Sequence, residues 1–205
     1  MTTEATAFLG LGANLGDRRH NLRAALDALR THEDVRVDSD GAVASLFETT
    51  PVGGPAGQPR FLNSAVRIRT TRSPLELLTI MQAVEATLGR HRAKTDGRSA
   101  VAADDTPGAA RGAPRTIDLD LLLYEDVQCT GETLALPHPR LHRRRFVLEP
   151  LAEIAPRLVH PRLQVTIETL RVRCEAEQRA VAIESPVEVV IRLHGPDWPW
   201  TTARR

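Results

Sequence analysis

The sequence is poor in aromatic residues and in cysteine, has almost no net charge, and contains no long apolar run. Its 27 basic residues against 26 acidic ones give a net charge of +1, so there is no general attraction to nucleic acid or to a membrane surface. No apolar stretch is long enough to span a bilayer, and the start MTTEATAFLGLG lacks the basic and apolar regions of a signal peptide. We therefore expect a cytoplasmic protein that binds neither nucleic acid nor membrane.

The two cysteines, Cys129 and Cys174, form neither a C-x-x-C pair nor a zinc-binding spacing. They are best explained as free thiols in a reducing compartment. Apolar and charged contents of 41% and 26% are typical of a globular protein. We expect one domain over residues 1–184 that includes a long flexible loop at 93–112, followed by a C-terminal extension at 185–205 of unknown role.

The spacing of apolar residues predicts a mixture of strands and helices. Strands are expected at residues 7–11, 35–38, 42–48, 61–70, from 118 onward and at 188–194, and helices around 22–29, 74–88 and 166–177. The helix at 74–88 is well marked, because Ser73 and Glu76 form a capping box and Gly89 suits its end. The order βαββαβ followed by helices predicts an α+β fold, a ferredoxin-like core with additional strands and helices in αβα layers.

Two carboxylates stand inside the apolar run TIDLDLLLY. In a strand, Asp118 and Asp120 share one face, while Ile117, Leu119 and Leu121 share the other. Two like charges at this spacing repel each other, and a divalent cation such as Mg²⁺ or Mn²⁺ would compensate them. For the tripeptide alone, an edge strand with a solvated polar face is an equally good explanation.

Arginines cluster near this strand in the sequence. Arg90 and Arg92 follow the second helix, Arg115 directly precedes the strand, and a basic run at 140–145 follows it. Guanidinium groups bind phosphate through paired hydrogen bonds, and carboxylate-held metal ions bridge phosphate oxygens. This combination is typical of phosphoryl transfer, although any single arginine is as readily explained as a solvated surface residue.

Phe61 and Asn63 suggest a site for a flat heterocycle, since an aromatic face can stack on the ring while an amide pairs with its edge. Phe61 on its own is more often a core residue. His138 and His142 are disfavoured as metal ligands because prolines flank His138, and a phosphate or structural contact suits His138 better. The turn after the first strand is not a dinucleotide fingerprint, because Leu15 stands where G-x-G-x-x-G needs glycine.

In combination, five segments resemble the 6-hydroxymethyl-7,8-dihydropterin pyrophosphokinase family. They are FLGLGANLGD, SLFETTPVGGPAGQPRFLNSAV, VEATLGRHR, PRTIDLDLLLY and LPHPRLHRRRFVLEPLAEIAP, which fall within residues 7–163. The resemblance implies a ferredoxin-like α+β fold and an ATP-dependent pyrophosphokinase. Such an enzyme transfers pyrophosphate from ATP to the hydroxymethyl group of 6-hydroxymethyl-7,8-dihydropterin, releases AMP and serves folate biosynthesis.

The resemblance also implies a set of site residues. Asp118 and Asp120 match the carboxylates that hold two Mg²⁺, and Arg90 and Arg115 match catalytic arginines. ATP-binding positions are matched by Gln82, Glu85, Arg90, Arg92, Arg115, Ile117, Leu121, His138 and Arg144. Pterin-binding positions are matched by Thr49, Val52, Phe61, Asn63 and Phe146, with the ring lying between the two phenylalanines. ATP and the pterin are the expected partners of a monomeric enzyme.

Two other functions fit parts of the sequence. A nucleotidyltransferase of the polymerase-β type also uses D-x-D with metals, but it carries a Gly-Ser pair shortly before the first acid, whereas Gly12-Ala13 lies far upstream here. A ferredoxin-like RNA-binding module could use the basic run at 140–145, but the chain lacks the paired aromatic strand motif of such modules. Three results distinguish these functions. Release of AMP indicates the pyrophosphokinase, and release of pyrophosphate indicates the nucleotidyltransferase. RNA binding that survives loss of Asp118 indicates the RNA-binding module.

Overall fold

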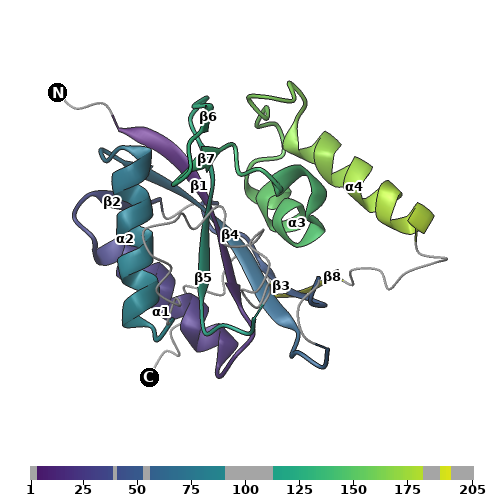
Figure 1. Ribbon diagram of the computed structural model, residues 1–205, viewed down its shortest axis with the longest axis horizontal. Helices are drawn as coiled ribbons and strands as arrows, with labels where there is room; N and C mark the ends of the chain where they lie inside the picture. The colour runs from purple at the N-terminus through teal and green to yellow at the C-terminus, as the bar shows by residue number, and fades with distance from the viewer. Residues whose placement is uncertain (1–3, 39–40, 53–55, 91–112, 182–189, 195–205) are drawn as a thin grey trace.

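One mixed α/β structure is formed by the described residues, which are 4–38, 41–52, 56–90, 113–181 and 190–194 of this computed structural model. Within these ranges six strands make a single sheet, and helices cover both of its faces (Figure 1). The predicted loop 93–112, Arg92 and residues 195–205 lie outside the described residues. Of the helices described, none has the length and apolarity needed to cross a membrane.

The sheet has the strand order β5-β1-β4-β3-β8, and β2 also pairs with β4. All neighbouring strands are antiparallel. Its strands are β1 (Ala5–Ala13), β2 (Val35–Val37), β3 (Leu46–Thr49), β4 (Phe61–Thr70), β5 (Asp118–Tyr124) and β8 (Val190–His194). With helices α1 (Arg18–Thr31) and α2 (Pro74–Thr87), strands β1, β3, β4 and β5 give the βαββαβ order, and the expected ferredoxin-like core is confirmed.

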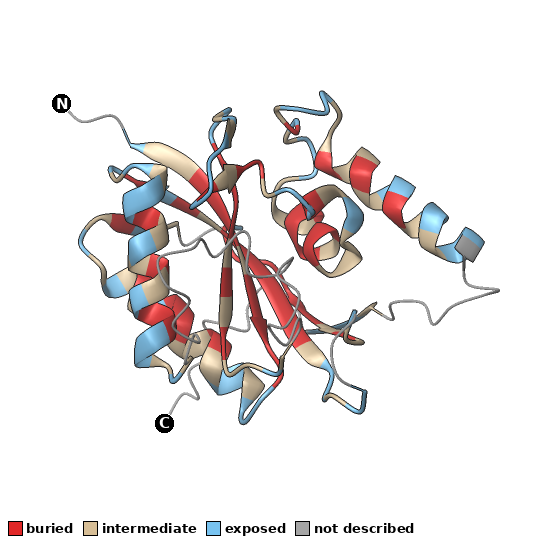
Figure 2. Cartoon of the chain, in the orientation of Figure 1, coloured by how far each residue is buried: buried red, intermediate tan, exposed pale blue. Residues whose placement is uncertain are grey.

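Two hydrophobic clusters lie on opposite faces of the sheet. Alternation along β1 explains the division, because Leu9 and Leu11 pack toward α1 and α2 while Phe8 packs in the other cluster. Helices α3 (Arg145–Ile154) and α4 (Ile167–Val181) cover that second face. Figure 2 shows the buried residues concentrated in the sheet and on the helix sides that face it. The αβα layering is therefore as expected.

The second helix follows its sequence signals closely. Ser73 caps α2, the Glu76 side chain accepts a hydrogen bond from the Ser73 N–H at 2.9 Å, and Leu77 and Met81 are fully buried. At the other end Gly89 has a φ of +80°, which glycine adopts at little cost, and the Arg90 N–H donates back to the Glu85 carbonyl at 3.0 Å. The reversal of the chain at Gly89 directs Arg90 back toward the sheet.

Differences from the expected elements are local. The predicted strand at 42–48 is interrupted, with an isolated bridge between Val43 and Val66 before β3 begins at Leu46. No separate pattern in the sequence predicts α3, since Pro150 lies inside it and removes a backbone donor. Pro150 is nevertheless buried with Leu148 and Leu151, so tertiary packing outweighs the lost hydrogen bond. A short hairpin of β6 (Cys129–Thr130) and β7 (Ala135–Leu136) and the 3₁₀ turn Leu141–Arg143 connect β5 to α3.

The core contact of α2 can be tested with Met81→Ala. Met81 is fully buried, so its truncation should lower the free energy of unfolding by about 2–5 kcal/mol. Leu75→Ala on the same helix is the control, since Leu75 is 55% exposed and should change stability by less than about 0.5 kcal/mol. Urea unfolding followed by circular dichroism measures both, and equal losses would contradict the packing of α2 on the sheet.

Candidate active site

Strand β1 lies between the strand that carries the two aspartates and the strand that carries Asn63, and so brings these polar residues close together. Gly12 pairs with Asp118 of β5 on one side and with Asn63 of β4 on the other, and Gly10 pairs with Asp120. A Cβ atom on Gly12 would stand 2.9 Å from the Asn63 Oδ1, whereas one on Gly10 would meet Leu122 at an ordinary 3.5 Å. The absent side chain at position 12 therefore gives Asn63 the space that it occupies beside the carboxylates.

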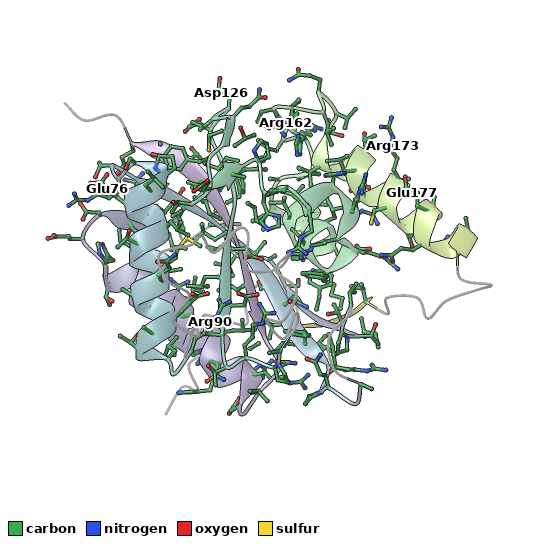
Figure 3. The ribbon with its side chains drawn as sticks, viewed as in Figure 1. Glu76, Arg90, Asp126, Arg162, Arg173 and Glu177 are labelled. Atoms are coloured by element: carbon green, nitrogen blue, oxygen red, sulfur yellow. The ribbon has the colours of Figure 1, made fainter. Side chains whose placement is uncertain are left out.

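Asp118 is held by two arginines. Its Oδ1 lies 2.5 Å from the Arg90 Nη1, and its Oδ2 lies 2.5 Å from the Arg115 Nη1. Figure 3 shows Arg90 beside the end of β5 at which Asp118 begins the strand. The positive charge that the sequence requires near this carboxylate is thus supplied, within the protein, by guanidinium groups.

A buried carboxylate fixes the position of Arg90. Glu85 is 1% exposed and lies on α2, where it accepts hydrogen bonds from Arg90 and, at 2.7 Å, from the Leu119 N–H of the edge strand β5. Burial disfavours the charge on Arg90, but Asp118 and Glu85 outweigh burial and hold the pKa of Arg90 above its ordinary value. Arg90 therefore remains cationic and is held between two acids.

Asp120 is the more open of the two aspartates. Its side chain is 33% exposed against 19% for Asp118, and its Oδ2 lies 4.0 Å from the Arg144 Nη1. His138 is close enough to be affected by the charge of Asp120, yet burial dominates and lowers the pKa of His138. The His138 Nδ1 accepts from the Arg140 N–H at 3.2 Å, so the neutral ring carries its proton on Nε2 and can donate from there.

The same arginines contact the predicted aromatic residues. The Arg115 guanidinium lies 6.0 Å from the ring centre of Phe61, and that of Arg144 lies 5.4 Å from the ring centre of Phe146. Asn63 is 5% exposed and donates from Nδ2 to the Thr49 Oγ1 at 2.8 Å. The aromatic and amide residues therefore adjoin the carboxylate group, as expected for one continuous site.

Asn14 is a site residue that the sequence did not indicate. It is 1% exposed, and its Oδ1 accepts from the Arg115 N–H at 2.7 Å while its Nδ2 donates to the Pro59 carbonyl at 3.4 Å. The backbone N–H of Asn14 also donates to the Arg115 carbonyl at 3.1 Å. Asn14 thereby joins the segment that carries Arg115 to the segment that leads into Phe61. Its place in the turn after β1 was the only signal available.

Some expected residues are placed differently. Ile117 is fully buried and Leu121 is 4% exposed, both in the cluster beneath α1 and α2, so their side chains do not line the face that carries the aspartates. Val52 is 65% exposed, beyond the end of β3. Gln82 is half-buried on α2, three residues before Glu85. These positions are not joined to the carboxylate group by the contacts described above.

The donor set suits a magnesium ion that is shared with a substrate. Mg²⁺ is commonly held by one or two carboxylates together with phosphate oxygens and water. Asp118 and Asp120 provide two carboxylates on one face of β5, and within the described ranges no group of three or more His, Cys, Asp or Glu side chains forms a complete protein cage. The remaining ligands would have to come from a substrate and from water.

Comparisons with known proteins identify the family. The family described as 7,8-dihydro-6-hydroxymethylpterin-pyrophosphokinase (HPPK) matches residues 8–156. A Bacillus subtilis protein named 2-amino-4-hydroxy-6-hydroxymethyldihydropteridine pyrophosphokinase is 43% identical over 148 residues, which cover 72% of this chain and 77% of its own. A Methylorubrum extorquens protein of the same name is 40% identical over 153 residues, covering 75% and 84%.

Solved structures support the same fold. A crystal structure of wild-type Plasmodium falciparum HPPK-DHPS superimposes with a TM-score of 0.61 at 14% sequence identity. The match covers 88% of this chain and 46% of that one, so this chain spans less than half of the Plasmodium protein. At this identity the likeness concerns the fold alone.

The role of Glu85 can be tested with two substitutions. Glu85→Ala leaves Arg90 and the Leu119 N–H without their buried partner and should lower the free energy of unfolding by about 3–5 kcal/mol. Glu85→Gln retains an acceptor for the Leu119 N–H, so its loss of unfolding free energy should be clearly smaller. Denaturant unfolding measures both, and a loss below about 1 kcal/mol for Glu85→Ala would show that the buried pair does not hold Arg90 in place.

Proposed function

Because the chain belongs to the 7,8-dihydro-6-hydroxymethylpterin-pyrophosphokinase family, we propose that it transfers pyrophosphate from ATP to the hydroxymethyl group of 6-hydroxymethyl-7,8-dihydropterin. AMP is the other product, and the reaction serves folate biosynthesis. The observation that carries the proposal is the pair of arginines, Arg115 and Arg144, each of which contacts both an aspartate and a phenylalanine. Such an arrangement brings a phosphate-binding region and a ring-binding region into one site.

On the phosphate side, three arginines and a neutral histidine act as donors. Arg90, Arg115 and Arg144 bind phosphate oxygens, and the neutral His138 donates from Nε2 without adding charge. Asp118 and Asp120 would hold two Mg²⁺, which neutralise phosphate charge and orient the attacking hydroxyl group in line. Asp120 is more exposed than Asp118 and less tightly paired, which suits it to accept the proton of that hydroxyl group.

On the ring side, aromatic stacking and paired hydrogen bonds select a flat heterocycle. Phe61 and Phe146 stack on the two faces of the pterin. Asn63 keeps its Oδ1 and one N–H for the amide-like edge of the ring, since its other N–H is donated to Thr49. Val52, which is 65% exposed, is assigned to the ring side by the family resemblance alone.

The remaining nucleotide contacts are proposed from the family resemblance. Gln82, Glu85 and Arg92 belong to the nucleotide side by the family resemblance. Ile117 and Leu121 would contact ATP only through their main-chain atoms, because their side chains are buried. We also propose a monomeric, cytoplasmic enzyme with a single catalytic domain at 1–184. The nucleotidyltransferase and RNA-binding interpretations have no support from the family match.

The reaction can be tested by separating nucleotides after incubation with ATP, Mg²⁺ and the pterin. AMP should form only when the pterin is present, and Asp118→Asn and Asp120→Asn should each slow its formation by about 100-fold or more, since metal positioning contributes several kcal/mol. Asp126→Asn is the matched control, because Asp126 is exposed just past the opposite end of β5 (Figure 3). Pyrophosphate in place of AMP, or full activity in both variants, would refute the proposal.

The space beside Asn63 gives a second test. Gly12→Ala places a methyl group against the Asn63 Oδ1 and should raise the pterin Kd about tenfold, whereas Gly10→Ala should change it by less than about twofold. Fluorescence titration with 6-hydroxymethylpterin would be carried out in the presence of Mg²⁺ and an ATP analogue with a methylene group between its α and β phosphorus atoms. Equal pterin Kd values for the two variants would show that Asn63 does not contact the pterin.

A further inference from the structure

Strand β8 lies beyond the family-matched segment 8–156 and adds a strand to the catalytic sheet. It pairs with β3 along its whole length, from Leu46 opposite His194 to Thr49 opposite Val190. Figure 1 shows β8 beside β3, on the side of the sheet away from β5. The C-terminal part of the chain therefore reaches the strand that carries Thr49, a residue of the proposed pterin site.

A polar cluster fixes β8 to two other elements. The Arg192 Nη2 donates to the Glu153 Oε1 at 2.7 Å and to the Ser45 Oγ at 2.8 Å, and the Arg192 Nε donates to the same Oγ at 2.9 Å. Ser45 donates from Oγ to the Glu153 Oε1 at 2.6 Å and from its backbone N–H to Oε2 at 3.1 Å. The cluster therefore joins β8, the residue before β3, and α3.

Arg192 determines how the other two groups can bond. A guanidinium has only donors, so the Ser45 Oγ must act as its acceptor and use its own hydrogen toward Glu153. Ser45 is fully buried and the Glu153 side chain is 22% exposed, so the carboxylate is partly removed from water. Arg192 supplies the positive charge that stabilises it there, although its own side chain is 55% exposed, which limits the strength of the pair.

The two elements joined by this cluster carry opposite sides of the proposed ring site. Ser45 immediately precedes β3, which ends at Thr49, and Thr49 accepts the hydrogen bond from Asn63. Glu153 lies near the end of α3, and Phe146 lies in the first turn of the same helix. A shift of α3 against β3 would therefore change the distance between Phe146 and the Asn63 side of the site.

We propose that Arg192 is a positioning residue for the pterin site, acting from the C-terminal extension through Ser45 and Glu153 to hold α3 against β3. The inference rests on the proposed function. Its effect is larger on the ring side, because α3 carries Phe146 in its first turn. On the phosphate side, Arg90 is held by Glu85 and Arg115 by Asn14, and only Arg144 directly adjoins α3. Loss of Arg192 should therefore weaken pterin binding more than ATP binding.

The test compares Arg192→Ala, Arg192→Lys and the control Ile191→Ala in the full chain. Ile191 neighbours Arg192 on β8 and is 41% exposed. The pterin Kd is measured by fluorescence titration in the presence of Mg²⁺ and the methylene ATP analogue, and the Kd of Mg-ATP by calorimetry. Arg192→Ala should raise the pterin Kd by about threefold to tenfold and leave the ATP Kd within about twofold, because a displaced contact group costs binding at its own side of the site. Arg192→Lys should recover part of the loss, and Ile191→Ala should match the wild type.

Other results separate the failure of this inference from the failure of the proposed function. An unchanged pterin Kd in Arg192→Ala, or the same loss in Ile191→Ala, would overturn the role of Arg192 while leaving the reaction intact. A parallel rise of the ATP Kd would also overturn it, since that pattern indicates general loss of structure, which a thermal unfolding curve of each variant would reveal. A wild-type protein that binds ATP but not the pterin would overturn the proposed function and the inference together.

Discussion

Antiparallel pairing of β1 with both β4 and β5 is the constraint on which the site depends. It sets Asp118, Gly12 and Asn63 in one row across three strands. A shift of either pairing by a single residue would turn a whole set of side chains to the other face of the sheet. The carboxylates would then enter the apolar layer beneath α1 and α2, where their desolvation is costly. The buried leucines of β1 and β5 therefore stabilise the register that keeps the polar residues on the other face.

The acidic side chains of the site are paired with arginines of the same chain. The acids Glu85, Asp118 and Asp120 face the guanidinium groups of Arg90, Arg115 and Arg144. Each arginine is therefore held in place before any ligand arrives, and under the proposed function little side-chain freedom remains to be lost when phosphate binds. The glycine that ends α2 and the buried Asn14 orient two of these arginines through backbone contacts, which is more restrictive than charge attraction alone.

The sequence predicted the parts of this structure that depend on local order. Apolar alternation, the capping box at Ser73 and the D-x-D face were sufficient to place α2, β5 and the order of the core strands. The helix α3 was not separable from its surroundings, because Pro150 weakens the local pattern and only burial compensates for it. Asn14 and Ser45 could not be identified either, since their partners at Arg115 and Glu153 lie 101 and 108 residues away in the chain.

The central position of β1 also affects how the molecule assembles. The strands that pair with β1 lie far from it in the sequence, because β4 begins at Phe61 and β5 at Asp118. Contacts of such long sequence separation form only after large loops have closed, which favours slow folding. Until β5 has joined the sheet, Asp118 cannot pair with Gly12 of β1, and Asn14 cannot accept the hydrogen bond from the Arg115 N–H. Competence to bind ligand is therefore among the last properties that the folding chain acquires, and ligand can stabilise only molecules whose sheet is already complete.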